Sequence, residues 1–342
     1  MSRVRTLVVD DSASMRAALN RILSADPEIE VIGLAPEPHA ARAMIKELSP
    51  DVMTLDVEMP GMDGLSFLEK VMRLRPMPVV MCSTLTSRGA EVSIEALRLG
   101  AVDCIAKPSG NPLEIARDAD LLCSTVKAAA RSAVRAAPNP VVPMQSFGAA
   151  TPARGRTVIG IGASTGGVEA LFAVLAALPA DCPPVLVVQH MPAAFTGSFA
   201  TRLDRECRVR VVEAVDGSPV EPGTVYIAPG GERHMTLSGG VGGRIKLRRG
   251  DAVSGHRPSV DVLFQSLAEL GPAAVGTILT GMGADGAQGL LAMRNAGART
   301  FGQSKESCVV YGMPRSAFEL GAVERQLSLS AMAEAVLSAC RA

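Results

Sequence analysis

The sequence predicts an α/β protein built from two modules, each organised around a mostly parallel, doubly wound sheet. Short apolar runs of strand-forming residues alternate with helix-like runs along most of the 342 residues, which is typical of strand–helix–strand units. The alternation stops only between residues 128 and 156, where Ala, Pro, Ser and Arg dominate. We therefore predict modules at residues 1–127 and 157–342, joined by a linker at residues 128–156.

Composition limits the functions open to the chain. Lys and Arg number 34, as do Asp and Glu, so a formal net charge of zero gives no general attraction to nucleic acid or anionic lipid. No apolar run is long enough for a membrane span, and the first residues form a strand pattern rather than a signal peptide. The seven cysteines lack CxxC spacing, which disfavours zinc sites and disulfide frameworks. We expect a cytoplasmic monomer that neither binds nucleic acid nor inserts into membranes.

Five apolar runs predict the strands of the first module. They cover residues 6–10, 29–34, 52–56, 78–83 and 102–106, with helical patterns in the intervals. This order predicts a five-stranded parallel sheet.

Polar side chains stand at the ends of four of these strands. Asp10 and Asp11 end the first strand and Asp56 ends the third, at the sheet edge where ligands bind in doubly wound folds. Three clustered carboxylates need a cation, and Mg²⁺ prefers oxygen ligands. Ser83 and Lys107 would bring a hydroxyl and an ammonium to the same edge. An alternative is that Asp10 and Asp11 only cap the next helix, but this leaves the other strand ends unexplained.

These residues, with the run MPGMDG at 59–64 and Pro108, resemble the receiver domain of two-component response regulators. The resemblance covers residues 3–125 and implies a flavodoxin-like fold. It implies that Asp56 accepts a phosphoryl group from a histidine kinase and that Ser83 and Lys107 contact the phosphoryl oxygens. It also implies a Lys107–Pro108 bond in the cis form. The Mg²⁺ ligands would be Asp10, Asp11, Asp56 and the Glu58 carbonyl. Receivers usually carry a switching aromatic where this chain has Cys104, which argues against that switching route but not against phosphorylation.

A serine on a glycine-rich turn opens the second module. The run VIGIGASTGG at 158–167 predicts a strand, a tight turn and a helix that starts near Gly167. Ser164 would face the unpaired N–H groups of that helix, which suits a phosphate ligand or a nucleophile whose reaction forms an oxyanion. The glycines also form a loose dinucleotide fingerprint, but the next strand ends in Gln189 and His190 instead of a ribose-binding acid.

Two further strands bring an imidazole and a carboxylate to the same edge. The strand at 185–189 leads to His190, next to Ser164 in a right-handed crossover, and the strand at 274–279 leads to Asp285. We predict a triad in which His190 is the general base and Asp285 orients it. In the alternatives, His256 paired with Asp261 is the base, or Asp285 caps its own helix.

Three remaining patterns bear on the second module. Residues 225–228 and 235–237 predict a hairpin that contains His234, and the basic run at 244–249 predicts a hairpin strand rather than a DNA-recognition helix. Residues 162–166 match the G-x-S-x-G elbow of α/β-hydrolases, but in that fold the acid precedes the histidine. We therefore expect a different fold. The fourth histidine, His39, lies in the first module.

The motifs GASTGG, VVQHMP, HRPSVD and LTGMGADGA, in this order, closely resemble the catalytic domain of the chemotaxis protein-glutamate methylesterases. The resemblance implies phosphorylation-regulated hydrolysis of glutamate γ-methyl esters on methyl-accepting chemoreceptors, together with glutamine deamidation, and no cofactor for the esterase. It implies an oxyanion site at the Thr165 and Met282 backbone N–H groups, with His256 and Arg257 lining the site. The competing hypothesis is a non-catalytic, phosphorylation-dependent scaffold, which would not need Ser164, His190 and Asp285 together.

Overall fold

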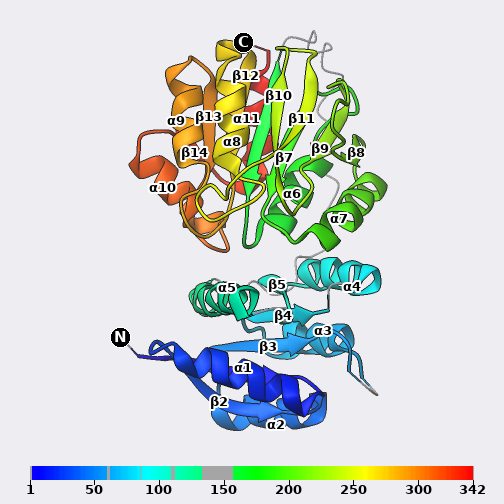
Figure 1. Ribbon diagram of the computed structural model, residues 1–342, viewed down its shortest axis with the longest axis vertical. Helices are drawn as coiled ribbons and strands as arrows, with labels where there is room; N and C mark the ends of the chain where they lie inside the picture. Colours follow the sequence, from blue (N-terminus) through cyan, green and yellow to red (C-terminus); the bar gives the residue numbers. More distant parts are fainter. Residues whose placement is uncertain (1, 60–61, 85, 109–111, 133–156, 342) are drawn as a thin grey trace. The chain divides into compact units, whose positions relative to one another are not determined.

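The computed structural model describes residues 2–59, 62–84, 86–108, 112–132 and 157–341 (Figure 1). The chain divides into two compact units, Met1–Pro140 and Val141–Ala342. Most of the predicted linker lies outside the described residues, but its first residues continue the last helix of the first unit, which ends at Ala130.

The first unit is the predicted five-stranded parallel sheet, in the order β2-β1-β3-β4-β5. Its elements are β1 (Val4–Val9), α1 (Ala13–Ala25), β2 (Ile29–Ala35), α2 (Pro38–Leu48), β3 (Val52–Asp56), α3 (Gly64–Leu74), β4 (Val79–Ser83), α4 (Ser87–Arg98), β5 (Asp103–Ala106) and α5 (Pro112–Ala130). Every residue of β3 and β4 is buried, as expected for central strands covered by helices on both faces. Ser12 caps α1 by accepting a hydrogen bond from the Met15 N–H, so the alternative in which Asp10 and Asp11 are mere caps is wrong.

The second unit has a seven-stranded parallel sheet in the order β14-β13-β12-β6-β7-β9-β8. Its strands are β6 (Val158–Ala163), β7 (Val185–Gln189), β8 (Arg210–Glu213), β9 (Thr224–Ile227), β12 (Ala274–Ile278), β13 (Arg299–Gln303) and β14 (Arg325–Leu327). Its helices are α6 (Gly167–Ala176), α7 (Ala193–Glu206), α8 (Val260–Ala268), α9 (Ala287–Asn295), α10 (Met313–Glu319) and α11 (Leu329–Ala339), with short 3₁₀ turns at Gly271–Ala273 and Lys305–Ser307.

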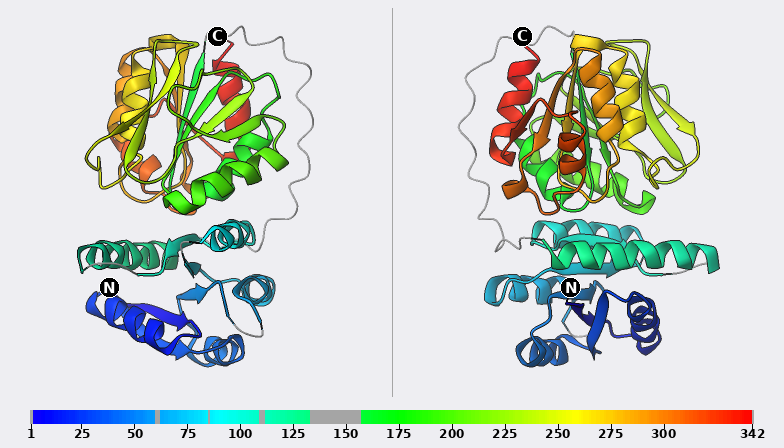
Figure 2. Two further views of the ribbon diagram at one scale, coloured as in Figure 1. Left: turned by 45° about the vertical axis from the view of Figure 1, so that its right-hand side comes forward. Right: turned by 90° about the vertical axis from the view of Figure 1, so that its left-hand side faces the viewer.

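Helices cover both faces of this second sheet (Figure 2). Helices α6 and α11 pack together on one face, while α8 and α9 pack together on the other. Val260, Leu263, Phe264 and Leu267 of α8 are fully buried in the core on that second face. Because the helices occupy the faces, the carboxyl ends of the strands are left as the edge where polar side chains can meet.

The predicted hairpin of residues 225–228 with 235–237 is wrong. Strand β9 lies in the sheet and runs parallel to both β7 and β8, and all four of its residues are buried, as suits an interior strand. The hairpin is formed instead by β10 (Arg233–Ser238) and β11 (Arg244–Arg249). Gly239 and Gly240 supply the positive φ angles that its turn requires. The prediction of a strand at 244–249 is confirmed.

None of the helices in the described parts of the chain combines the length and the apolar character needed to cross a membrane.

Candidate active site and phosphoryl-acceptor site

In the first unit, two buried carboxylates share one lysine. Asp10 directly follows β1 and Asp56 ends β3, and their side chains are 0% and 2% exposed. Lys107 Nζ lies 2.8 Å from Asp10 Oδ2 and 2.8 Å from Asp56 Oδ2. The single positive charge of Lys107 offsets only part of the negative charge of the two buried carboxylates, so the pair keeps a net negative charge.

Asp11 completes a three-carboxylate cluster with these residues. One ligand oxygen from each of Asp10, Asp11 and Asp56 lies within 4.8 Å of the others, and only Asp11 is exposed. Three carboxylate oxygens at this spacing are the donor set that a hard divalent cation such as Mg²⁺ prefers. The arrangement fits the expected metal site, with Asp11 on the solvent side.

The pKa values at this site follow from burial and from the lysine. Burial is the largest influence on Asp56 and raises its pKa, although Lys107 opposes the shift. Burial would lower the pKa of Lys107, but hydrogen bonds to Asp10 and Asp56 outweigh it and raise the pKa. The lysine therefore stays charged, while the surroundings of Asp56 stabilise its ionised form only weakly.

The other predicted residues of this site lie around Asp56. The Glu58 N–H donates to Asp56 Oδ1 at 3.2 Å. Ser83, fully buried at the end of β4, donates its hydroxyl proton to the Thr84 carbonyl. Burial raises the pKa of the Cys104 thiol to about 12, so it stays protonated. Pro60 and Gly61 of the predicted loop lie outside the described residues.

The predicted cis bond between Lys107 and Pro108 is wrong, because Arg257–Pro258 is the only cis peptide bond in the described part of the chain. The backbone positions the lysine side chain without a cis bond. The Lys107 N–H donates to the Ser83 carbonyl at 2.9 Å and extends the pairing of β4 with β5. From this position Lys107 Nζ already reaches both carboxylates.

In the second unit, Ser164 follows β6 at the start of α6. Its N–H donates to the Thr280 carbonyl at 3.0 Å, and its own carbonyl accepts from the Gly167 N–H at 2.7 Å and from Gln189 Nε2 at 2.9 Å. A Cβ on Gly281 would lie 2.7 Å from Ser164 Cβ, a separation that real side chains do not tolerate. Hydrogen bonds to three residues thus hold the backbone of Ser164, and this fixes the position of the Cβ atom that carries its hydroxyl.

His190 stands beside Ser164 because their strands are neighbours in register. Ala163 pairs with Gln189, the residues directly before the two side chains. His190 Nε2 lies 2.8 Å from Asp285 Oδ2, while Nδ1 is buried without a hydrogen-bond partner. The structure therefore joins His190 to Asp285 as predicted. It records no hydrogen bond between the Ser164 hydroxyl and His190 within the described residues.

Asp285 has hydrogen-bond donors on both oxygens. Oδ1 accepts from Ser259 Oγ at 2.7 Å and from the Asp261 N–H at 3.1 Å, and Oδ2 accepts from the Val260 N–H at 2.7 Å as well as from His190. The alternative in which Asp285 caps its own helix is wrong, because Gly286 precedes α9 and Asp285 instead faces the N-terminus of α8. Burial alone would raise the pKa of Asp285, but His190 and the α8 donors lower it to about 2.

His256 stacks face to face on the ring of His190. The ring centroids lie 3.7 Å apart and the planes differ by 6°. Burial and the neighbouring His190 lower the pKa of His256 to about 4, so the ring is neutral at physiological pH. The alternative in which His256 pairs with Asp261 is wrong, since the Asp261 carboxylate instead accepts from the Gly289 N–H and from Ser254 Oγ.

The other predicted residues of this site are Met282, Thr165 and Arg257. The Met282 N–H, one residue after Gly281, has no acceptor within the described residues. Thr165 is buried, and its carbonyl accepts from Thr280 Oγ1 at 3.0 Å. Arg257 donates from Nη1 to the Gly250 carbonyl at 3.1 Å.

Three polar residues that support the site were not predicted. Ser259 caps α8 and donates to Asp285. Gln189 donates to the carbonyls of Ser164 and His190. Thr280, in the loop after β12, donates from Oγ1 to the Thr165 carbonyl. A serine one residue before a helical run is an N-cap signal that could have identified Ser259. His234, in contrast, is structural, with Nδ1 accepting from the Ser259 N–H and Nε2 bonded to the Asp251 carbonyl.

Comparison with known proteins decides the family. The family model described as CheB methylesterase matches residues 159–336, and the response regulator receiver domain model matches residues 6–117. The chain belongs to the CheB methylesterase family. It is 55% identical to protein-glutamate methylesterase/protein-glutamine glutaminase 1 of Caulobacter vibrioides over 98% of both chains. It is also 56% identical to protein-glutamate methylesterase/protein-glutamine glutaminase of Agrobacterium fabrum, over 97% of this chain and 95% of that one.

A solved structure supports the fold of the second unit. The CheB methylesterase catalytic domain of Thermotoga maritima is 38% identical and matches with a TM-score of 0.52, covering 53% of this chain and 97% of that one. The family membership confirms both the predicted fold class, a receiver domain followed by a parallel α/β methylesterase domain, and the prediction of an esterase.

Proposed function

We propose that this enzyme hydrolyses glutamate γ-methyl esters of methyl-accepting chemoreceptors, and deamidates receptor glutamines, with Ser164, His190 and Asp285 as the catalytic triad. The observation that carries the proposal is the His190–Asp285 hydrogen bond at the end of β7, directly beside Ser164 at the end of β6. The names of the relatives support a protein glutamate methyl ester and a protein glutamine as substrates, and the geometry supports the choice of residues.

The reaction would begin with attack of Ser164 Oγ on the ester carbonyl. His190 would take the seryl proton on Nδ1, the ring nitrogen that Asp285 does not occupy. The backbone N–H groups of Met282 and Thr165 would hold the oxyanion, and one such donor typically contributes about 10²–10³ in rate. His190 then returns the proton to the leaving methoxide, so methanol departs and an acyl-enzyme remains. Water, deprotonated by His190, hydrolyses the acyl-enzyme to glutamate and free Ser164.

Asp285 and His256 would set the charge of the catalytic base. Because its pKa is about 2, Asp285 stays ionised at neutral pH and stabilises the imidazolium that forms on His190. His256 stays neutral against the ring face and so adds no competing positive charge. Arg257 would line the entrance from the same segment. The esterase reaction needs no cofactor in this scheme.

In the receiver domain, Asp56 would accept a phosphoryl group from a chemotaxis histidine kinase. Mg²⁺ would be held by Asp10, Asp11, Asp56 and the Glu58 carbonyl, and its role when bound is to neutralise charge on the transferred phosphoryl group. Lys107, already 2.8 Å from Asp56, would contact the phosphoryl oxygens together with Ser83. Phosphorylation would raise esterase activity by favouring the active population of the two-domain protein.

The domain division that we propose for this cytoplasmic enzyme is a receiver domain at residues 1–127, a linker at 128–156 and a catalytic domain at 157–342. The division places all the acceptor-site residues before the linker and the whole proposed triad after it.

The test is methanol release from methylated chemoreceptor membranes, measured with and without acetyl phosphate and Mg²⁺. We expect release that rises with the phosphodonor, and a fall of at least about 10³-fold in Ser164→Ala. Ser338→Ala, which changes an exposed serine on α11, is the matched control and should behave as wild type. Release that persists in Ser164→Ala would refute the nucleophile. Folded wild type that releases no methanol from receptors of its own source would favour the scaffold hypothesis.

A further inference from the structure

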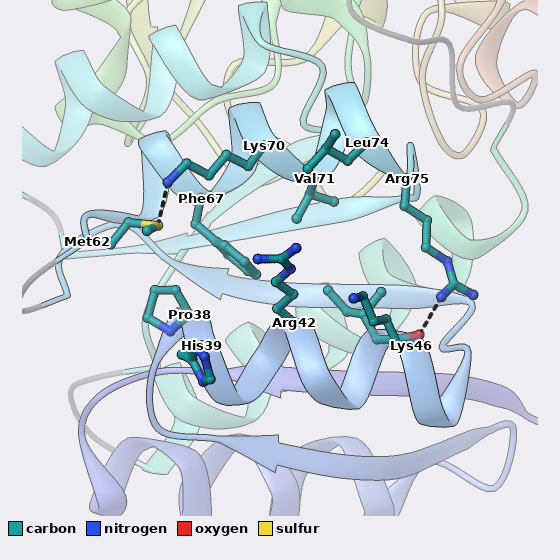
Figure 3. A pocket seen from close by; sticks show the side chains of 11 residues that line it. Pro38, His39, Arg42, Lys46, Met62, Phe67, Lys70, Val71, Leu74 and Arg75 are labelled. Carbon is teal, nitrogen blue, oxygen red and sulfur yellow. Dashed lines mark hydrogen bonds between the residues drawn. The ribbon is translucent and has the colours of Figure 1, made fainter.

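Helices α2 and α3 of the receiver domain enclose a groove of about 520 Å³ (Figure 3). Its apolar lining comes from Ile45 on α2, from Phe67, Val71 and Leu74 on α3, and from Met62 just before α3. Leu74 is 68% exposed, whereas Ile45, Phe67 and Val71 are buried and form the floor of the groove. Its volume lies within the range of about 300–1,000 Å³ that is typical of ligand-binding clefts.

The polar side chains that line the groove are all basic or neutral. His39, Arg42 and Lys46 come from α2 and Lys70 from α3, with Arg75 at the end of α3, and no lining residue is acidic. Arg75 is engaged with the Ile45 carbonyl and Ser49 Oγ, and Lys70 lies 3.6 Å from Met62 Sδ. Within the described residues, Arg42 and Lys46 form no ion pair. The groove therefore carries uncompensated positive charge in a chain whose formal net charge is zero.

The groove is elongated along both helices. Its lining residues recur at helical spacing, at positions 38, 39, 42, 45 and 46 on α2 and at 67, 70, 71 and 74 on α3. Eight to nine residues of helix span about 12 Å, which is the length of roughly two helical turns in a bound partner. A partner helix with apolar residues at i, i+3, i+4 and i+7 would match this length and chemistry.

We propose that the α2–α3 groove binds an acidic amphipathic helix of a partner protein. Its apolar face would cover Leu74 and the half-buried Met62, above a floor of buried Ile45 and Phe67, and its carboxylates would pair with Arg42, Lys46 and Lys70. Such ion pairs would favour an acidic partner over others, because charge complementarity at the rim of a groove selects the partner and speeds association. The groove shares no lining residue with the phosphoryl-acceptor site or with the proposed triad, so this binding role is independent of the proposed reaction.

The test uses the full-length chain and a fluorescein-labelled helical peptide with Leu and Phe on one face and Glu on the flanks. Fluorescence anisotropy should show saturable binding that weakens by at least about tenfold in the double variant Arg42→Glu/Lys46→Glu, as expected for loss and reversal of two ion pairs. The double variant Arg3→Glu/Arg21→Glu makes the same change in net charge at exposed positions outside the groove and should bind like wild type. Leu74→Gln, which alters an already exposed side chain, should weaken binding several-fold without loss of fold.

Several results would overturn the proposal. They are absence of saturable peptide binding, equal weakening by both double variants, and equal affinity for a peptide in which Lys replaces Glu. A second arm replaces the peptide with vesicles that contain phosphatidylglycerol. Vesicle binding that Arg42→Glu/Lys46→Glu abolishes, without peptide binding, would assign the groove to a membrane surface and refute a protein partner. Unchanged Asp56 phosphorylation in every variant is the control for folding.

Discussion

Two buried carboxylates, Asp56 in the receiver domain and Asp285 in the catalytic domain, both lie on the carboxyl-end side of a parallel sheet but have opposite surroundings. Asp56 is the last residue of β3, and Asp285 lies in the loop between β12 and α9. Asp285 receives four hydrogen bonds, from Ser259, Val260, Asp261 and His190, and its pKa falls to about 2. Asp56 receives one backbone hydrogen bond and the shared Lys107, and burial raises its pKa.

In the proposed function, this difference separates a carboxylate that must react from one that must not. A nucleophilic carboxylate needs an oxygen that is free to form a bond, so few fixed donors surround Asp56, and its main partner is a side chain that can move to the incoming group. An orienting carboxylate must stay charged and stationary, so fixed backbone donors at a helix N-terminus hold Asp285. With these proposed roles, the same residue type would serve two chemistries through the number of its hydrogen-bond donors.

Asp56→Asn should give the largest effect. The amide cannot form an acyl phosphate, so we expect no phosphoryl incorporation from acetyl phosphate and Mg²⁺ by phosphate-affinity electrophoresis, with basal methanol release retained. Asp120→Asn, an exposed position on α5, is the matched control and should incorporate phosphate normally. Incorporation in Asp56→Asn would mean that another carboxylate of the cluster is the acceptor.

Asp285→Asn should give the next largest effect. The amide cannot stabilise the His190 imidazolium, and loss of such a charge lowers kcat by about 10⁴-fold in serine hydrolases. Single-turnover methanol release would measure it, with unchanged Asp56 phosphorylation as the control. A decrease smaller than about tenfold would show that Asp285 contributes mainly to the stability of α8 and not to catalysis.

Ser259→Ala should have a moderate effect, because three donors to Asp285 remain. Loss of an N-cap hydroxyl costs about 1–2 kcal/mol of unfolding free energy, and this hydroxyl also bonds to Asp285. Urea denaturation would measure the cost, and we expect kcat to fall far less than in Asp285→Asn. A kcat as low as that of Asp285→Asn would contradict the idea that the number of donors, rather than one donor, anchors the carboxylate.

The last prediction concerns the stability of the folded chain in acid. The pKa of His256 is lowered from 6.5 to about 4, so the unfolded chain takes up this proton first, and the unfolding free energy should fall as the pH drops from about 7 towards 4. His256→Asn should remove that part of the pH dependence. The stabilisation from Asp285 persists in this window, since it is lost only as the pH falls from 3.8 towards 2. An unchanged pH profile of the urea midpoint in His256→Asn would contradict the assignment.

Much of the architecture and of both sites follows from local sequence patterns. The predicted third strand at 52–56 coincides with β3, and the start of α6 at Gly167 is as predicted. Asp10, Asp56, Ser164 and His190 each lie at or directly after the end of a buried strand, where parallel topology brings polar side chains to one edge. Strand periodicity alone therefore predicts that these residues gather.

The tertiary structure decided what holds those residues in place. The His190–Asp285 bond joins positions 95 residues apart, and the bonds from Ser259, Val260 and Asp261 to Asp285 span 24 to 26 residues. The parallel placement of β9, the stacking of His256 on His190 and the groove between α2 and α3 likewise depend on how separate elements pack. The sequence by itself determined which residues reach the two sheet edges, because that depends on periodicity within one segment. Only the packed chain decided their donors, charge states and neighbours, because those come from segments whose distance is set by the fold.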